Sequence, residues 1–357
     1  MKPHVVVVSH ACVLDANRSP YRTLATAAAV TIVTPAAWAH AFSPEPFQSS
    51  DAPFPGRVLT FPARQVGRPQ RYTLRCWPGR VLRQTQASFV IIEEEAFSLS
   101  GLWWSWAARR HALPYAIQAA ENLDRRFPAP VRRWRDSVLA HASLVMARSP
   151  MAGERAKEAG ARGSVQVIAH GVDEVASTNA PATNTLVGFV GRLVPEKGVA
   201  DLLTLARERP DWSFAVVGDG PLRSDVEAAG DNVRWLGSLA NGDMPAFYAT
   251  LAALVVPSRT TPTWTEQFGR IIIEALAQGV PVVAYDSGEI PWVASVTGAV
   301  LVAEGDVEAL GEAVAVVLAD QEQREVLATR GREAVRSHFT NEAAGRALVA
   351  WLDSFVS

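Results

Sequence analysis

The stretch "EQFGRIIIEALAQGVPVVA", residues 266–284, decides how this chain folds. Apolar side chains recur there at the spacing of one helix face, and Gly279 is placed to end the helix. The next residues, "PVVA", have the uninterrupted apolar character of a strand covered on both sides. A helix that leads directly into a buried strand predicts a parallel α/β sheet. The side chains expected on the buried helix face are Ile271, Ile272, Ala275 and Leu276.

The same alternation of strands and helices continues on both sides of this stretch. Short Val, Ile and Leu runs predict buried strands, and helical stretches such as residues 200–209 lie between many of them. The order βαβαβ occurs twice, so we expect two Rossmann-like, doubly wound parallel-sheet domains. The predicted strands are residues 5–8, 30–33, 89–92, 115–117, 144–145, 165–168, 187–190, 213–217, 254–256 and 281–284.

The length of 357 residues also favours two domains, because single cores rarely grow so large. Residues 173–184, "DEVASTNAPATN", have no hydrophobic period and are the predicted linker. We therefore expect an N-terminal domain at residues 1–175, a C-terminal domain at 184–335 and a last segment at 336–357. The last segment contains an amphipathic helical pattern.

Composition excludes several classes of protein. The only two cysteines, Cys12 and Cys76, are far apart in sequence, so neither a zinc site nor a disulfide framework is predicted. The N-terminus, "MKPHVVVVSH", predicts a first strand rather than a signal peptide. No run of about 18 apolar residues is present to span a membrane. We expect a cytoplasmic protein.

Charge is distributed unevenly along the chain. Residues 1–183 carry 21 basic and 13 acidic side chains, whereas residues 184–357 carry 13 basic and 23 acidic ones. Seven arginines and no acid lie between Arg57 and Arg83, and seven more arginines lie between Arg109 and Arg135. This asymmetry predicts an anionic partner for the N-terminal half.

Basic and glycine-rich loops follow two predicted strands of the C-terminal half. In "LVGFVGRLVPEKG" (186–198), Arg192 and Lys197 follow the strand and its Gly191, which suits them to bind a diphosphate. In "AVVGDGP" (215–221), a flat base or sugar could lie against the turn at Gly218. An ordinary solvated loop and a tight structural turn remain the alternatives.

Two glutamates flank the start of the helix in the opening stretch. Glu266 lies in the loop before the helix, where Gly269 allows close backbone approach and the helix amides favour an anion. Glu274 lies about two turns into the helix and could accept hydrogen bonds from a diol. Alternatively, Glu274 is a solvated residue paired with Arg270.

Together these stretches resemble the family-4 retaining glycosyltransferases, whose two-domain fold with a central cleft is called GT-B. The match covers residues 186–335 in family order and is weaker in the N-terminal half. The matching stretches are "GFVGRLVPEKG" (188–198), "VVGDGPLR" (216–223), "VRWLGSL" (233–239), "VVPS" (255–258), "EQFGRIIIEALAQGVPVVAYDSGEIP" (266–291) and, less specifically, "VVVVSHACVLDANRSPYRTLA" (5–25), "AENLDRRFPAP" (120–130) and "VIAHGVD" (167–173).

The resemblance implies a nucleotide-sugar donor bound mainly by the C-terminal domain and transfer with retention of anomeric configuration. Arg192 and Lys197 would stabilise the diphosphate leaving group without an obligatory metal or other cofactor. Glu266 would hold the donor sugar, and Glu274 would hold the ribose. The other implied donor contacts are the amides of Phe268 and Gly269, and Leu236 and Gly237 beside the base. The last helix would cross back to the N-terminal domain.

The N-terminal half departs from this family where the donor and acceptor would meet. The loop "SHACVLDANRSP" (9–20) lacks the family's paired glycines, and Asn17 or Arg18 could take their place. The usual mid-domain histidine is missing, and Glu121, Asn122 or His10 could serve instead. At least one residue of "EEE" (93–95) is expected to face the cleft, with the others in solvent.

The acceptor is predicted to be a lipid, a glycan or a small molecule. Three tryptophans in "GLWWSWAARRHALP" (101–114), among many arginines, suit peripheral attachment to an anionic membrane, or else they pack inside the protein. Nucleic acid is disfavoured because no binding module is present and the pI is about 6.4. A dehydrogenase is disfavoured because no Gly-x-Gly-x-x-Gly follows the first strand. A sugar-nucleotide epimerase or a non-catalytic carbohydrate-binding partner of the same fold remains possible.

Overall fold

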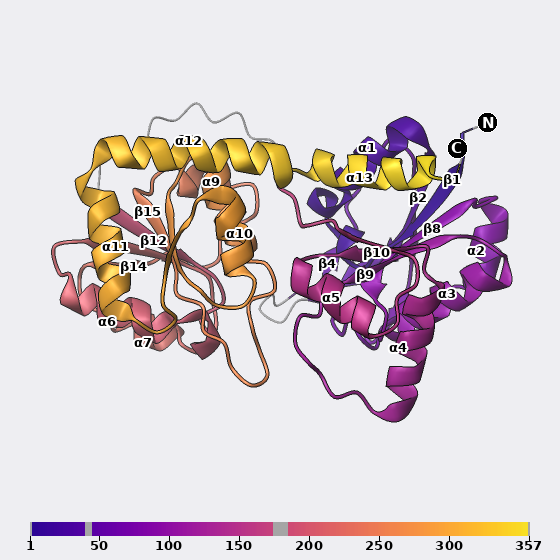
Figure 1. Ribbon diagram of the computed structural model, residues 1–357, viewed down its shortest axis with the longest axis horizontal. Coiled ribbons are helices and arrows are strands. Elements are labelled where there is room, and N and C mark those ends of the chain that lie inside the picture. The colour runs from indigo at the N-terminus through magenta and orange to yellow at the C-terminus, as the bar shows by residue number, and fades with distance from the viewer. Residues whose placement is uncertain (1, 40–44, 174–184, 356–357) are drawn as a thin grey trace. The chain divides into compact units, whose positions relative to one another are not determined.

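The computed structural model describes residues 2–39, 45–173 and 185–355. The chain divides into two compact units (Figure 1). Unit 1 contains Met1–Ala169 and Asn341–Ser357, and unit 2 contains His170–Thr340. The predicted linker lies outside the described residues from position 174 onward.

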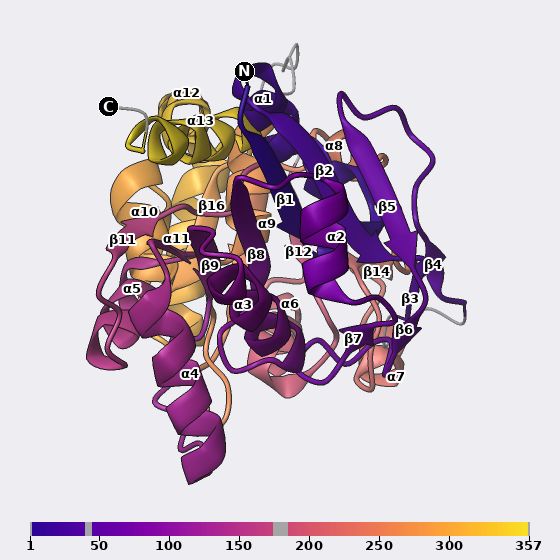
Figure 2. The ribbon, with the colours of Figure 1, turned by 90° about the vertical axis from the view of Figure 1, so that its right-hand side faces the viewer.

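Unit 1 is built on a seven-stranded sheet in which every neighbouring pair of strands is parallel. Figure 2 shows β8, β1, β2 and β5 side by side. The apolar runs predicted from the sequence form its centre, where β1 pairs with both β2 and β8. In spatial order the strands are β11 (Ser164–Val167), β10 (Leu144–Ala147), β9 (Tyr115–Ala119), β8 (Phe89–Glu95), β1 (His4–Val8), β2 (Ala29–Pro35) and β5 (Arg57–Phe61).

Helices connect these strands, and two short two-stranded sheets lie in the loops. Local capping starts two of the helices, because Ser98 Oγ accepts from the Gly101 amide and Ser149 Oγ from the Ala152 amide. The elements are η1 (Ala11–Val13), η2 (Asp15–Arg18), α1 (Ser19–Ala27), α2 (Pro78–Gln84), α3 (Leu99–Arg110), α4 (Ala129–His141), α5 (Pro150–Glu158) and α13 (Asn341–Asp353), with β3 (Ala37–Trp38) paired to β4 (Phe47–Gln48) and β6 (Ala63–Arg64) to β7 (Thr73–Leu74).

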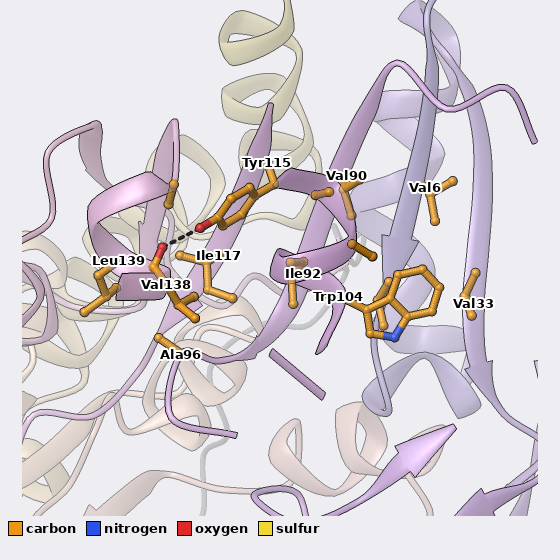
Figure 3. Close-up of a cluster of buried hydrophobic side chains, with 14 of the residues drawn as sticks. Val6, Val33, Val90, Ile92, Ala96, Trp104, Tyr115, Ile117, Val138 and Leu139 are labelled. Carbon is orange, nitrogen blue, oxygen red and sulfur yellow. Dashed lines mark hydrogen bonds between the residues drawn. The ribbon is translucent and has the colours of Figure 1, made fainter. Parts of the chain in front are cut away.

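The valine run of β1 supplies both faces of the unit 1 core, since side chains alternate along a strand. Val6 packs in one cluster with Ile92 and Trp104, and Figure 3 shows this face. There the Tyr115 hydroxyl donates to the carbonyl of Val138 at 2.5 Å. The alternate valines pack in the cluster on the opposite face, together with side chains from α1 and α13.

The last helix, α13, completes this second face of unit 1. Leu348, Trp351 and Leu352 are buried in the same cluster as Leu24 of α1. Figure 1 shows α13 running beside α1. The Trp351 ring also packs edge-on against Phe89 at 5.6 Å between centroids. The amphipathic helix α13 therefore buries its apolar face in the core of unit 1.

Unit 2 is built on a six-stranded parallel sheet with helices between its strands. The helix of the opening stretch, α9, buries Ile273 rather than the expected Ile271, together with Ile272, Ala275 and Leu276. The strands in spatial order are β14 (Val233–Trp235), β13 (Ser213–Val217), β12 (Leu186–Val190), β15 (Ala253–Val256), β16 (Val282–Tyr285) and β17 (Val300–Val302). The helices are η3 (Pro195–Lys197), α6 (Val199–Glu208), α7 (Arg223–Glu227), α8 (Met244–Tyr248), α9 (Arg270–Ala277), α10 (Ile290–Thr297), α11 (Val307–Ala319) and α12 (Gln321–His338).

Three strands of the large sheets were not predicted from the sequence: β5, β14 and β17. Each lies at the edge of its sheet, and none of their residues is fully buried. An edge strand needs no continuous apolar run, and in β5 and β14 polar residues interrupt the signal that revealed the central strands. Strand β17 is a run of only three apolar residues, which is too short to stand out.

Candidate active site

Loops at the carboxyl ends of neighbouring strands meet in unit 2. Strand β12 lies between β13 and β15, so the loops that follow these strands share one end of the sheet. The Gly191 amide donates to the carbonyl of Val217 at 3.0 Å, and the Gly218 amide to the carbonyl of Gly237 at 2.8 Å. The predicted glycines therefore tie these loops together.

Two of these loops pack so closely that only glycine fits between them. Gly198 has a left-handed φ of 72°, and a Cβ placed there would lie 1.8 Å from the carbonyl oxygen of Pro257. This approach fixes the loop that carries Lys197 against the loop that follows β15. The Arg259 guanidinium adds a second link, with hydrogen bonds of 2.6 and 2.8 Å to the Asp201 carboxylate of α6.

Lys197 and Glu266 meet at this junction. Nζ of Lys197 lies 2.5 Å from Oε2 of Glu266, to which Ser258 Oγ also donates at 3.2 Å. The Gly269 amide donates to Oε1 of Glu266 at 3.3 Å. The Lys197 ammonium also lies 4.8 Å from the centre of the Trp264 ring. The geometry thus places a cation, a buried carboxylate and the beginning of α9 together.

Arg192 is the more accessible of the two predicted cations. Its side chain is 45% exposed, and its guanidinium lies 3.7 Å from Glu196, four residues on. An exposed pair at this distance is held weakly. Arg192 can therefore turn toward an anionic ligand at little cost.

Glu274 has two protein partners. Arg270 Nε lies 2.9 Å from Oε1, so the ion pair considered as the alternative from the sequence is present. The Tyr248 hydroxyl donates to Oε2 at 3.0 Å. Burial, together with the charge of Glu274, raises the pKa of Tyr248, which keeps this hydroxyl a donor. Glu274 is thus oriented from two sides while its carboxylate remains partly exposed.

Leu236 and Gly237 follow β14 directly and are held by the neighbouring strand. The Leu236 amide donates to the carbonyl of Val216 at 2.9 Å. Trp235 Nε1 donates to the carbonyl of Gly218 at 2.8 Å, and the Arg223 guanidinium lies 3.9 Å from the centre of the Trp235 ring. The stretches containing Trp235 and Arg223 were noted in the sequence, but the stacking of the two side chains was not predicted.

The Phe268 side chain belongs to the core of unit 2. It is 3% exposed, and its ring lies within 5.8 Å of the rings of His170, Trp292 and Phe339. Only its backbone can therefore reach a ligand, as the resemblance implied. The Gly269 amide already donates to Glu266, so a ligand would have to share or displace this bond.

In unit 1, His10 stands at the carboxyl end of β1. Its Nδ1 lies 2.9 Å from both carboxylate oxygens of Glu94, which also accepts from the Tyr72 hydroxyl at 2.5 Å. Burial lowers the pKa of His10, but Glu94 and the nearby charge of Glu93 outweigh this effect and raise it. The Trp38 ring packs 4.5 Å from the imidazole. His10 is therefore a fixed, readily protonated group.

Arg18 does not occupy a position where it could face a ligand. It is fully buried, and its guanidinium donates to the carbonyls of Cys12 and Ser50 and to Ser49 Oγ at 2.8 to 3.0 Å. Its charge serves to hold two loops of unit 1 together. Asn17 is only half-buried, and its side chain donates to the carbonyl of Ala11 at 2.8 Å.

The three consecutive glutamates on β8 are all engaged within unit 1, so the expectation that those not facing the cleft lie in solvent is wrong. Glu93 pairs with Arg148 at 2.6 Å, and Glu94 binds His10. Glu95 accepts from the amide of Ala120 at 2.8 Å, and burial raises its pKa to about 7.

Glu95 lines a cavity of about 190 Å³ at the carboxyl ends of β8 and β9. Glu121 lines the same cavity and pairs with Arg125 at 2.5 Å. The next residue along the chain, Asn122, is 2% exposed. The structure therefore brings Glu121 together with Glu95, whereas His10 belongs to a separate group around Glu94.

Comparison with proteins of assigned function gives partial matches. Residues 173–334 match the family described as glycosyl transferases group 1. The 2-deoxystreptamine glucosyltransferase of Streptomyces kanamyceticus is 37% identical over 175 residues, which cover 46% of this chain and 44% of that enzyme. The lipopolysaccharide core biosynthesis glycosyltransferase LpsE of Rhizobium meliloti is 26% identical over 262 residues, covering 70% of this chain and 75% of LpsE. The chain thus spans less than half the length of the first relative.

Comparison with solved structures extends over the whole chain. Alr3699/HepE from Anabaena, in complex with UDP, superposes with a TM-score of 0.73 at 19% identity, covering 99% of this chain and 100% of that one. At this identity the likeness establishes the fold, which is the GT-B arrangement of two Rossmann-like domains expected from the sequence. The match to the family described as glycosyl transferases group 1, by contrast, is confined to residues 173–334, which lie within unit 2.

Proposed function

We propose that this chain is a retaining glycosyltransferase that moves a sugar from a nucleotide-diphosphate sugar to an acceptor hydroxyl. The observation that carries the proposal is the junction of Lys197, Glu266 and the beginning of α9 in unit 2. A cation beside an oriented carboxylate suits a ligand that combines a diphosphate with a hydroxyl-rich ring. The group 1 family match and the UDP complex of Alr3699/HepE support the same donor class.

In this proposal the bond between the anomeric carbon and the donor phosphate breaks, and its electron pair stays on the diphosphate. Lys197 and Arg192 stabilise the charge that develops there. The acceptor oxygen forms the new bond, and its proton passes to the leaving phosphate on the same face of the sugar, which retains the configuration.

Two carboxylates orient the donor. Glu266 accepts hydrogen bonds from the sugar hydroxyls, and Glu274 accepts them from the ribose. The base lies beside Leu236 and Gly237. Lys197 and Glu266 already contact one another. When the donor binds, its phosphate and hydroxyl groups replace part of this contact, and neither side chain has to move in from solvent.

We propose further that no metal ion or cofactor is required, because Lys197 and Arg192 supply the positive charge that a divalent cation would otherwise provide. An assay of transfer after exhaustive treatment with EDTA tests this point. Unchanged activity is expected, and activity restored only by added Mg²⁺ or Mn²⁺ would contradict it.

A thermal-shift screen tests the donor site itself. Folded protein is heated with UDP-, GDP-, ADP-, CMP- and dTDP-sugars, because a ligand that binds the native state raises the melting temperature by mass action. One nucleotide is expected to raise it in the parent and not in Glu274→Ala. Arg223→Gln is a useful second variant, because it probes the stack on Trp235 while leaving both glutamates in place.

Product analysis separates transfer from the alternatives. Transfer of labelled sugar to a lipid, glycan or small-molecule acceptor, with retained configuration, supports the proposal. Nucleotide-sugar binding without transfer in any acceptor screen favours a non-catalytic carbohydrate-binding partner, and interconversion of the donor sugar favours an epimerase.

We also propose that the protein is cytoplasmic. A lipid acceptor would bring the enzyme to a membrane surface.

A further inference from the structure

Helix α3 of unit 1 presents two tryptophans on its outer side. Trp104, Ala107 and Ala108 are buried and attach the helix to the core. Trp106 is 46% exposed, and Trp103, three residues earlier, is only partly buried. Residues three or four positions apart share one helix face, so these two rings form one apolar stripe.

A third tryptophan, Trp77, extends this stripe. It lies directly before α2 and is 55% exposed. Its ring packs edge-on against Trp103 at 5.9 Å and against Trp106 at 6.1 Å between centroids. Trp77, Trp103 and Trp106 thus form one continuous surface, which we call the tryptophan patch.

Leaving such a patch in water is unfavourable. Trp is a large apolar side chain with one polar N–H, and contiguous exposed apolar area on a protein commonly marks an interaction site. The patch is not needed to hold unit 1 together, because the core side of α3 is filled by other residues. Its exposed rings therefore indicate a partner.

Positive charge accompanies the patch. Residues 52–92 and 96–120, which supply α2 and α3, contain no Asp or Glu. Arg80 is exposed in the first turn of α2, and Arg110 at the end of α3 lies 5.9 Å from the centre of the Trp106 ring. Trp favours the membrane–water interface, and Arg attracts anionic headgroups. The two residue types together therefore suit an anionic lipid surface.

We propose that the tryptophan patch docks unit 1 onto the surface of an anionic lipid bilayer. The contact is peripheral, with the rings at headgroup depth and the arginines on lipid phosphates. None of the described helices is both long and apolar enough to cross a bilayer. A second copy of the chain is a poor occupant, because two such basic surfaces would repel each other. Single-stranded nucleic acid is also disfavoured, because the rings stand edge to face, at 80° and 81°, instead of offering parallel stacking platforms.

The proposal goes beyond sugar transfer and does not depend on it. Vesicle binding is measured on the full chain without donor or acceptor. If vesicle binding is absent, the nucleotide-dependent thermal shift can still be observed. If the thermal shift is absent, vesicle binding can still be observed. The two proposals therefore fail separately.

Co-sedimentation with vesicles tests the docking surface. The full chain is mixed with phosphatidylcholine vesicles, with or without phosphatidylglycerol, at low and high salt. Pelleting is expected with the anionic vesicles and is expected to weaken at high salt. The double variant Trp77→Ser/Trp106→Ser is expected to stay in the supernatant, whereas Val326→Ser, at a 61% exposed position on α12, should pellet like the parent.

Charge variants test the contribution of the arginines beside the tryptophan patch. Arg80→Gln and Arg110→Gln are each expected to lower vesicle partitioning roughly fivefold. Arg207→Gln, at an exposed position on α6, is the control and should have no effect. Circular dichroism melting confirms that each variant is folded.

Three results would overturn the proposal. The first is equal pelleting with neutral vesicles, and the second is pelleting that survives the loss of both tryptophans. The third is an absence of binding to anionic vesicles, and a tryptophan-dependent interaction with single-stranded RNA or with a second copy of the chain would then identify the occupant. The last two partners are detected by gel shift and by light scattering.

Discussion

Nζ of Lys197 and Oε2 of Glu266 lie 2.5 Å apart, although 69 positions separate the two residues in the chain. The pairing of β12 with β15 produces this contact, because it brings the loops that follow both strands to one end of the sheet. The Gly198–Pro257 approach then leaves little room for either loop to move. The ion pair is thus a consequence of strand order, and it makes the two side chains energetically dependent on one another.

Substitution of Lys197 alone should be more damaging than substitution of the pair. Lys197→Met leaves the largely buried Glu266 carboxylate without its cation and is expected to lower the free energy of unfolding by roughly 2 kcal/mol. The double variant Lys197→Met/Glu266→Gln should recover much of this loss. Urea denaturation of parent, single and double variants gives the coupling, and simple additivity of the two single effects would contradict the interdependence.

Glu274→Gln tests nucleotide binding without removing the side chain. Glutamine has one acceptor oxygen where glutamate has two, so one hydrogen bond from a ribose hydroxyl is lost. The Kd for the nucleotide selected by the thermal-shift screen should therefore rise roughly tenfold. Tyr248→Phe removes the hydroxyl that orients Glu274 but keeps the carboxylate, and it should have a smaller effect. Isothermal titration calorimetry compares the two. An equal Kd for parent and Glu274→Gln would mean that Glu274 serves only its ion pair with Arg270.

Gly198→Ala tests the close approach of the two loops. The added Cβ would meet the carbonyl of Pro257 and also impose a left-handed conformation on alanine. Gly160→Ala is a matched control, because Gly160 has a φ of 93° and a Cβ added there would meet no other part of the described chain within 4 Å. The control should lose about 1–2 kcal/mol from backbone strain alone. Gly198→Ala should lose clearly more, measured by chemical denaturation, and similar losses would show that the loops can separate.

The stability of unit 1 should depend on pH through His10. The pKa of His10 is raised in the folded state, so the folded protein binds its proton more tightly than the unfolded chain does. The stabilising contribution is complete below the unfolded pKa of about 6.5 and is lost as pH rises through the raised folded value. Urea midpoints from pH 5 to pH 9 should show this decline in the parent and a flatter profile in His10→Gln. Glu94→Gln should flatten it as well, and an unchanged slope in both variants would argue against the pair.

Sequence reasoning succeeded where the chain is buried on both sides of a sheet. The valine run at the N-terminus and the "PVVA" run after α9 are fully or largely buried interior strands of their sheets, and both were predicted. Residues 57–61 and 233–235 were missed because these edge strands mix polar and apolar side chains. Residues 300–302 are all apolar, but the run is only three residues long and was not assigned.

Side-chain partners were harder to predict than strands. Lys197 and Glu266 were each singled out, but their contact requires knowledge of which strands are neighbours. Arg18 was expected near a ligand and is instead fully buried, because the loop containing Ser49 and Ser50 folds over it. On α3, Trp104 is buried in the core, whereas Trp103 and Trp106 are not. Which of the three rings is buried depends on which face of the helix packs against the sheet, and the sequence alone does not determine that face.

The position of α13 has a consequence for biosynthesis. Unit 2 is one continuous segment, so all of it is synthesised before the last helix is made. Unit 1 is begun first but finished last, because α13 covers an apolar face that includes Leu24 and Phe89. A nascent chain therefore carries an uncovered sheet face during the whole synthesis of unit 2. A premature stop before Asn341 would release a protein with that face permanently open to chaperones and aggregation.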